Sequence, residues 1–347
     1  MEGGSLLLAL IVIFALIAIL PLFVKPIENN IELFLMAMGV IAALVSHVLT
    51  AANLAAIFTD HFLYIITAAV FVVSLLFRLL ESQVKRFVDF LLGCLPLKLV
   101  VFLLVVLLGL LSSVITAIIA SLLLVEMVSI LPLSRKDQVH VSIVACFSIG
   151  LGAVLTPIGE PLSTIVTSKL HQDFFFMLRL LGIAIVVGVL LLGLFSMFFA
   201  DNNWRAKYNE GMEIIPERED FKTISLRTGK IFLFVMSLML LGDAFKPVID
   251  TYIIHWNDNL LYAANTVSAI LDNATLAAAE ISPSMDNAKI TTILISLLVS
   301  GGMMVTGNIP NIVTAGKLKI SMRDWAIFGL PVGAAMLAGY YVVLFHV

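Results

Sequence analysis

Long apolar stretches are the feature that most limits how this chain can fold. Six stretches each run for about 20 mainly apolar residues, the length that an α-helix needs to cross the hydrocarbon core of a bilayer. Of the 347 residues, 61% are hydrophobic and only 12% are charged, whereas about a quarter of the residues in a soluble domain are charged. The sequence therefore predicts an all-α integral membrane protein that lies in the lipid bilayer. The six predicted spans cover about residues 5–24, 31–51, 61–80, 174–200, 230–250 and 324–346.

Charge and cysteine content argue against several other classes of protein. The net charge is −3 and the chain has no basic face, so we expect no nucleic acid as a partner. Cys94 and Cys146 lie in apolar segments without CxxC or histidine spacing, which indicates neither a disulfide framework nor a zinc site. An intramembrane hydrolase needs a nucleophile with a base, or an HExxH pair, and the sequence shows neither. We expect no enzyme activity and no cofactor.

Two regions, about 97–172 and 257–319, interrupt the apolar pattern with Ser, Thr, Gly, Pro, Asn and acidic residues. In the first region, two half-length apolar pieces meet at the polar residues 112–116, which predicts a re-entrant hairpin. In the second region, residues 259–271 and 276–281 flank the polar tip 272–275 and predict another hairpin. Polar tips of this kind at membrane depth must be buried in protein or line a wet cavity.

Each predicted hairpin is followed by a helix that must unwind. Two prolines and a glycine fall within residues 155–162, and the sequence Gly-Asn-Ile-Pro-Asn falls within residues 305–312, so neither segment can remain regular helix. Glycines just before the two breaks favour close approach of helices; they are Gly150, Gly152, Gly301 and Gly302.

Topology relates the two regions. Three crossings separate the two hairpins, so the hairpins enter from opposite faces, as in the inverted repeats of secondary transporters, which share one site at the bilayer midplane. With residues 201–229 placed in the cytoplasm, all but four of the 20 Lys and Arg residues lie on the cytoplasmic side. We therefore expect a multi-pass protein of the cell (inner) membrane with both termini outside. The four exceptions are Lys169, Arg179, Lys246 and Lys289.

The expected organisation alternates scaffold helices with transport units. The units are N-terminal scaffold helices (1–96), the first hairpin and broken helix (97–172), scaffold helices with a cytoplasmic linker at 201–229 (173–256), the second hairpin and broken helix (257–319), and a C-terminal helix (320–347).

Glu160 in the first break and Asp272 in the second hairpin tip are the main candidates for function. A carboxylate at the bilayer centre costs about 3 kcal/mol unless it faces a cavity or a partner. Carboxylate, amide and hydroxyl oxygens beside freed carbonyls suit a hard cation such as Na⁺, and a desolvated carboxylate can take a proton when the cation leaves. Each acid could instead cap the half-helix that follows. The supporting ligands that we expect are Asn273, Thr275, Thr156, Thr306, Asn308, Asn311, Ser113 and Thr116.

Four other acidic residues lie in predicted spans or hairpins. Glu32 and Asp243 are close to span ends and could simply reach interfacial water. Glu126 and Glu280 lie in the returning arms of the two hairpins, and the sequence leaves open whether they form supporting hydrogen bonds or transfer protons. The hydroxyls of the first tip could likewise bond to backbone carbonyls within a helix.

The two predicted breaks resemble those of the ion transporter superfamily. This superfamily includes the divalent anion/sodium symporters, the arsenite permeases and the NhaB- and NhaD-type sodium/proton antiporters. Residues 156–161, Thr-Pro-Ile-Gly-Glu-Pro, are similar to its TPIG-x-P break, and residues 307–313, Gly-Asn-Ile-Pro-Asn-Ile-Val, are similar to its GNxxN break. Residues 268–273 resemble the hairpin tip of NhaD-like antiporters, and the Gly-Leu-Pro at residues 329–331 is also typical.

The resemblance covers residues 97–346 and is closest to a branch of cation transporters within the superfamily. It implies an elevator-type carrier, a homodimer, in which a transport domain of hairpins and broken helices slides against a scaffold. It also implies that Asp272 and Asn273 occupy the second hairpin tip, with the two breaks around the ion.

Two departures from the superfamily favour a cation as substrate. The carboxylate symporters have Ser-Asn-Thr tips, whereas this chain has Ser-Val-Ile-Thr at 113–116 and Asp-Asn-Ala-Thr at 272–275, and Glu160 adds negative charge. We therefore predict a sodium/proton antiporter in which Glu160 and Asp272 alternately bind Na⁺ and H⁺, with Na⁺ as transported ion. The alternative is a sodium-coupled symporter of a small carboxylate or oxyanion that binds at half-helix N-termini, although neither break contains a basic residue.

Overall fold

The computed structural model describes residues 3–28, 30–61, 93–200, 221–248, 257–267, 273–281 and 285–346, together with residues 251 and 283 and scattered residues between 63 and 90. Every regular element in these residues is a helix. In chain order they are α1 (Gly3–Phe23), α2 (Lys25–Glu28), α3 (Ile31–Val45), α4 (Ala51–Thr59), α6 (Leu97–Ile115), α7 (Ala117–Ile130), α8 (Arg135–Ala153), α9 (Pro161–Lys169), α10 (Phe176–Ser196), the 3₁₀ turn η1 (Met197–Phe199), α12 (Phe221–Val248), α13 (Asp258–Val267), α14 (Asn273–Glu280), α15 (Asn287–Met303), the 3₁₀ turn η4 (Val305–Gly307), α16 (Ile309–Leu318) and α17 (Met322–His346).

Several of these helices have the length and composition of membrane spans. Within the described residues, five are long and apolar enough to cross a bilayer, namely Gly4–Pro21, Leu97–Ile115, Phe176–Phe199, Ile224–Val248 and Met322–Phe345. Large apolar side chains on them face outward; Ile183 of α10 is 86% exposed and Phe198 of η1 is 82% exposed. Exposed apolar surface of this kind suits contact with lipid and not with water. The chain is therefore all-helical in its described part and carries the apolar helices of a membrane-embedded protein.

The structure differs from the predicted spans at two places. The span predicted at 31–51 ends as a helix at Val45, because the chain turns at Ser46 and His47, where φ of His47 is 59°. A new helix, α4, then begins, with Thr50 Oγ1 accepting a hydrogen bond from the N–H of Asn53 at 3.1 Å. The first piece of the first hairpin is also longer than predicted, since α6 continues through Ser112 and Ser113 to Ile115. The span predicted at 61–80 lies largely outside the described residues.

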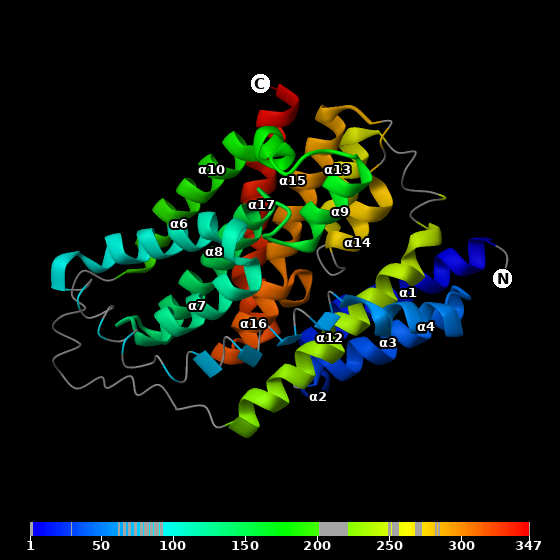
Figure 1. The fold of residues 1–347 in the computed structure, drawn as a ribbon, viewed down its shortest axis with the longest axis horizontal. Coiled ribbons are helices and arrows are strands. Elements are labelled where there is room, and N and C mark those ends of the chain that lie inside the picture. The colour runs from blue at the N-terminus through cyan, green and yellow to red at the C-terminus, as the bar shows by residue number, and fades with distance from the viewer. Residues whose placement is uncertain are drawn as a thin grey trace.

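The helices form two groups that are visible in Figure 1. Helices α1, α3, α4 and α12 lie together on one side, while α6–α10 and α13–α17 form the larger group. The packing of α3 on α12 is close, because a Cβ at Gly39 would lie 3.1 Å from the carbonyl oxygen of Ser237. In the larger group, α10 packs against α6 and α8, and α17 packs against α15 and α8. The two groups meet where α12 contacts α14 and α1 contacts α17.

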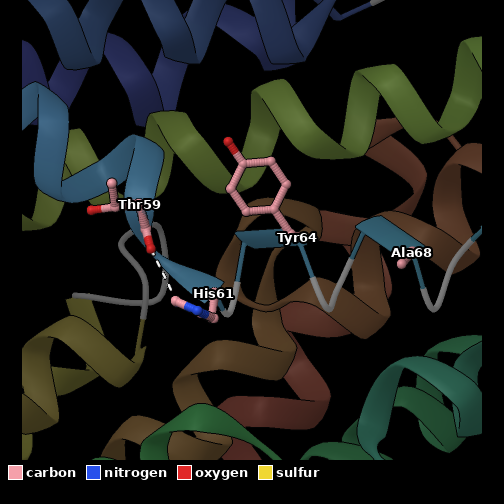
Figure 2. A pocket seen from close by; sticks show the side chains of 4 residues that line it. All are labelled: Thr59, His61, Tyr64 and Ala68. Atoms are coloured by element: carbon pink, nitrogen blue, oxygen red, sulfur yellow. Dashed lines mark hydrogen bonds between the residues drawn. The ribbon is translucent and has the colours of Figure 1, made fainter.

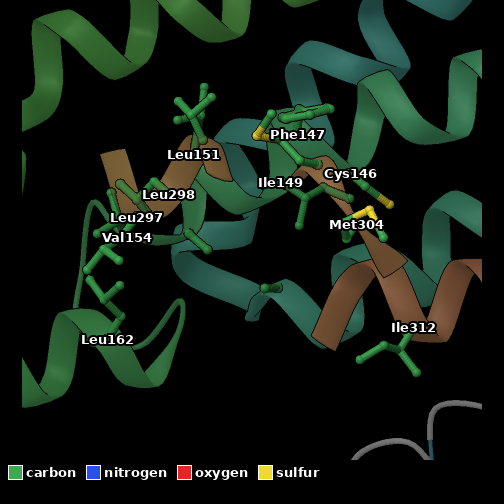
Figure 3. Close-up of a cluster of buried hydrophobic side chains, with 14 of the residues drawn as sticks. Cys146, Phe147, Ile149, Leu151, Val154, Leu162, Leu297, Leu298, Met304 and Ile312 are labelled. Carbon is green, nitrogen blue, oxygen red and sulfur yellow. The ribbon is translucent and has the colours of Figure 1, made fainter. Parts of the chain in front are cut away.

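Helix α8 is the centre of the larger group. Every residue from Val141 to Leu155 is buried, and α8 contacts α6, α7, α10 and α15. The predicted packing role of the glycines is confirmed, since a Cβ at Gly152 would collide with the backbone of Gly109 and one at Gly302 would collide with the ring of Phe147. Figure 3 shows the hydrophobic cluster around this crossing, in which side chains from α8 meet Leu297 and Leu298 of α15.

Candidate functional site

Both interruptions lie where prolines and glycines predict them. Helix α8 ends at Ala153 and α9 begins at Pro161, so residues 154–160 form the first break. Helix α15 ends at Met303 and α16 begins at Ile309, so residues 304–308, including η4, form the second break. Leu297 and Leu298 belong to the same hydrophobic cluster as Val154, the first residue of the first break, and Leu162, which follows the break (Figure 3). The core therefore brings the first break next to α15.

The first break is bonded to the turn between α6 and α7. Thr156 Oγ1 donates to the carbonyl oxygen of Ser113 at 2.5 Å, and the N–H of Ala117 donates to the carbonyl oxygen of Gly159 at 2.9 Å. The turn itself is strained, because Thr116 is β-branched and has φ 74° and ψ 149°. A conformation of this kind costs about 1–3 kcal/mol and persists only where surrounding contacts impose it. The two hydrogen bonds to the first break are contacts of that kind.

Hydroxyl groups satisfy the backbone carbonyls of the first break. Ser163 Oγ donates to the carbonyl oxygens of Thr156 at 2.7 Å and Glu160 at 2.8 Å, and Thr164 Oγ1 donates to that of Pro157 at 2.5 Å. Sequence reasoning missed Ser163 and Thr164, although hydroxyl residues two to four positions after a break are the available signal. The hydroxyl of Ser113 donates to Leu110 within its own helix at 2.7 Å, which is the structural alternative stated for this residue.

Glu160 stands immediately before α9. The residue is half-buried, and its Oε1 is buried from solvent. The carboxylate is thus placed at the positive N-terminal end of a nine-residue helix, where the helix dipole favours negative charge. This position is compatible with both expectations for Glu160, a cap for α9 and a ligand in the first break.

The side chain of Asn311 holds the second break together. It is fully buried, and its Nδ2 donates to the carbonyl oxygens of Gly301 at 2.8 Å and Met304 at 2.7 Å. The indole Nε1 of Trp325 in α17 donates to the carbonyl oxygen of Gly302 at 3.1 Å. The end of α15, which would otherwise leave carbonyls without donors, is thus bonded by an amide and an indole. The local sequence around Trp325 contains no signal that would have predicted its hydrogen bond to the second break.

Asn308 and Thr306 occupy the same break. Asn308 Oδ1 accepts a hydrogen bond from the N–H of Asn311 at 3.0 Å and caps α16. Its Nδ2 lies against α8, since a Cβ at Gly150 would be 3.2 Å from that atom. Thr306 is buried in η4. The second break is therefore enclosed by α8 on one side and by its own amide side chains on the other.

Asn273, the first residue of α14, reaches the same place. It is buried, and its Nδ2 lies so close to Gly301 that a Cβ at Gly301 would collide with it. Asn273 Oδ1 and Asn311 Oδ1 are both buried, and no donor within the described residues bonds to either oxygen. A buried amide oxygen without a donor costs about 1–3 kcal/mol. Two such oxygens around Gly301 are what a bound cation or ordered water would compensate.

Two residues of the predicted site cannot be placed. Asp272 lies outside the described residues, together with residues 268–271. Thr275 lies in the first turn of α14, and its side chain is outside the described part. Asn273, Ala274 and Thr275, which the sequence assigns to the tip, belong to the helix α14 instead.

The predicted residues accordingly form two groups. Ser113, Thr116 and Thr156 meet at the first break, whereas Asn273, Thr306, Asn308 and Asn311 meet at the second. Helix contacts connect the groups, since α14 packs against α9 and α7 packs against α16. Glu160 directly precedes α9, the helix that packs on α14.

No site for a transition metal is present in the described part of the chain, which brings together no group of three or more His, Cys, Asp or Glu side chains. A cavity of about 610 Å³ is lined by Thr59, His61, Tyr64 and Ala68 (Figure 2). His61 Nδ1 lies 3.2 Å from the carbonyl oxygen of Thr59. None of the predicted site residues lines this cavity.

These features define a class of protein: a membrane-embedded helical protein whose buried core contains two interrupted helices. The chain belongs to the family described as protein of unknown function (DUF1646), whose model matches residues 7–347. No curated protein matches the chain.

Proposed function

We propose that the protein is a secondary transporter that exchanges Na⁺ for H⁺. The observation that carries this proposal is the pair of buried amide oxygens, Asn273 Oδ1 and Asn311 Oδ1, which both flank Gly301 at a helix break and lack donors within the described residues. Neutral oxygens of this kind replace the hydration shell of a hard cation. Broken helices that coordinate ions with freed backbone and side-chain oxygens are a common solution in secondary transporters.

The polar groups at the breaks favour a cation over an anion. An anion would be bound by N–H groups at the N-termini of half-helices. At α16 the N–H of Asn311 is already bonded to Asn308 Oδ1, and α9 is preceded by the carboxylate of Glu160. An anion would therefore have to displace Asn308 Oδ1 at α16 and would meet a carboxylate of like charge at α9. Neither break contains a Lys or Arg residue.

The helix packing supports an inverted repeat with two re-entrant hairpins and two discontinuous membrane helices. Helix α7, the returning arm of the first hairpin, packs on α16, and α14, the returning arm of the second, packs on α9. Each hairpin therefore packs on the second half of the other interrupted helix, a reciprocity that an inverted repeat requires. We extend the proposal to an elevator-type homodimer in the inner membrane, with both termini outside and residues 201–229 in the cytoplasm.

Proton coupling requires a group that either ligand can occupy. In the proposal, Glu160 and Asp272 bind Na⁺ while ionised and are protonated when the cation leaves. Glu160 Oε1 is buried and lies just before α9, where the helix dipole favours the ionised form and a cation can replace a proton. Na⁺ is the transported ion, and no resident cofactor is part of the proposal.

Proteoliposomes that contain a pH-sensitive dye test the proposal. With an imposed pH gradient, addition of Na⁺ or Li⁺ to the wild type should move protons, and the absence of proton movement with Na⁺, Li⁺ and K⁺ would refute antiport. Uptake of a labelled carboxylate or oxyanion that depends on Na⁺, without proton movement, would favour the symporter instead.

Two pairs of variants test the site. Glu160→Gln and Asn311→Ala should each lower Na⁺-dependent proton flux at least tenfold. Asp324→Asn and Asn287→Ala are the matched controls, since both residues are exposed and outside the breaks. Wild-type flux in both Glu160→Gln and Asp272→Asn would show that the acidic residues are assigned wrongly.

A further inference from the structure

A second buried carboxyl lies away from the two breaks. Glu280, the last residue of α14, is 1% exposed. Its Oε2 accepts a hydrogen bond at 2.9 Å from Asn265 Nδ2 of α13, and the same amide nitrogen donates to Ser296 Oγ of α15 at 3.1 Å. Ser296 Oγ in turn donates to the carbonyl oxygen of Ile293 at 2.8 Å. A chain of hydrogen bonds that joins three helices thus ends at this carboxyl.

No positive group within the described residues compensates a charge on Glu280. Asn265 is the one donor that the described structure gives to this carboxyl, and it is neutral. The ionisable side chains described on the elements that pack around α14 are exposed or bonded elsewhere: Lys289 to Asp258 (3.4 Å), Lys230 to Glu32 (3.5 Å), Asp243 to Asn53 (3.2 Å) and Tyr262 to the carbonyl of Leu337 (2.7 Å), with Lys222 and Lys246 exposed.

The equivalent acid in the other hairpin is in a different environment. Glu126 lies on α7, the returning arm of the first hairpin, and forms an ion pair with Lys317 of α16. A carboxylate with a cationic partner has its charge compensated, and removing one partner would leave the other charge uncompensated. Glu280 has one neutral donor, so an ionised form would be costly and a bound proton removes that cost. The two acids that the sequence left equivalent are therefore different groups.

The position of Glu280 separates it from the oxygens proposed for the cation. Asn273 and Glu280 are seven positions apart along α14, which corresponds to about 10 Å at the helical rise of 1.5 Å per residue. We infer that Glu280 is a proton-binding carboxyl of the second hairpin, distinct from the cation-binding oxygens of Asn273 and Asn311. The ligand of this site is a proton taken from water by one carboxylate oxygen, and it returns to water when Glu280 ionises again.

This inference rests on the proposed exchange of Na⁺ for H⁺ where it concerns transport, but proton binding itself can be measured without transport. Infrared spectroscopy of the purified protein in lipid at neutral pH should show the carbonyl stretch of a protonated carboxylic acid, and Glu280→Gln should remove it. Glu126→Gln is the matched control and should leave that band unchanged. A spectrum in which Glu280→Gln retains the full band would overturn the inference.

A second variant keeps the test decisive if Glu280→Gln fails to fold. Asn265→Ala removes the neutral donor but keeps the carboxyl, so the band should shift to higher frequency, as expected for a carbonyl that has lost a hydrogen bond. An unchanged band frequency in Asn265→Ala would overturn the inference as well.

Transport assays then separate this inference from the proposed function. Glu280→Gln in proteoliposomes should retain exchange of labelled Na⁺ for unlabelled Na⁺ but lower Na⁺-driven proton flux at least tenfold. If the wild type moves no protons, the proposed antiport fails, while the infrared band still decides whether Glu280 binds a proton. If the wild type moves protons and Glu280→Gln moves them equally fast, Glu280 has no part in coupling and the inference fails.

Discussion

Both interrupted helices leave backbone carbonyls without intrahelical donors, and different side chains bond to these carbonyls in the two breaks. In the first break, the hydroxyls of Ser163 and Thr164 donate to the free carbonyls, and Ile158 is 51% exposed. In the second break, residues 304–307 are buried, and Asn311 and Trp325 donate to the carbonyls. A hydroxyl or indole N–H leaves no carbonyl oxygen behind, whereas an amide donates two hydrogens and keeps its own oxygen. The second break is thus the one whose supporting side chain also supplies a buried oxygen.

The largest expected loss of stability comes from substitution of Asn311 in the second break. Asn311→Ala removes both hydrogen bonds to the carbonyls of Gly301 and Met304 in a fully buried segment, so we expect a loss of about 3 kcal/mol of unfolding free energy. Thermal unfolding in detergent measures it, with Asn287→Ala as the exposed control. An unchanged melting temperature would show that the second break does not depend on this amide.

Glycine substitutions should separate stability from ion binding. Gly159→Ala places a Cβ against the backbone carbonyl of Ala153, which cannot move freely. We therefore expect a loss of about 2 kcal/mol of unfolding free energy. Gly301→Ala instead meets the end of the Asn273 side chain, so Na⁺ affinity should fall more than stability does.

Gly316→Ala is the control for both glycine variants. Nothing lies within 4 Å of its Cβ position, so a helical alanine there should stabilise by about 0.5–1 kcal/mol. Calorimetry and Na⁺ titration of the three variants measure both effects. If Gly159→Ala and Gly301→Ala lost stability and Na⁺ affinity in the same proportion, the two glycines would not have the separate roles expected here.

Ser163→Ala should have a smaller effect than Asn311→Ala. It removes the donor to two carbonyls in the first break, but this break is only partly buried, so water can replace the hydroxyl in part. We expect a loss of about 1 kcal/mol of unfolding free energy. Thermal unfolding measures it, with Ser225→Ala on the exposed surface of α12 as the control. A cost equal to that of Asn311→Ala would remove the difference between the two breaks.

The smallest effect should come from the exposed connection after the first break. Arg179 donates to Asp173 at 2.5 Å and the N–H of Phe175 donates at 2.8 Å, and these bonds hold the pKa of Asp173 below its ordinary value. A carboxyl with a lowered folded-state pKa stabilises the protein above its unfolded pKa of about 4, and this stability is lost as the pH falls through the folded-state value. The melting temperatures of wild type and Asp173→Asn should therefore converge at acidic pH, and a constant difference would contradict this.

The sequence by itself determined the helical membrane class and the positions of both breaks. These properties are local: apolar length allows a helix to enter a bilayer, and the prolines at 157, 161 and 310, which have no backbone N–H to donate, favour a break or a new helix start there. The end of α3 at Val45 and the length of α6 were missed, because hydroxyl residues can either end a helix or bond within it. Asp272 remains a prediction.

Only the tertiary structure decided what the polar residues at the core do. Glu126 on α7 and Glu280 on α14 occupy similar positions in the two predicted hairpins. Lys317, 191 residues further along the chain, pairs with Glu126, whereas Asn265 donates a hydrogen bond to Glu280. Likewise, the oxygens of Asn273 and Asn311 are left without donors by packing around Gly301, which no local pattern records. Whether a buried charge is compensated and a buried polar atom is hydrogen-bonded depends on contacts between segments far apart in the sequence, and the tertiary fold determines those contacts.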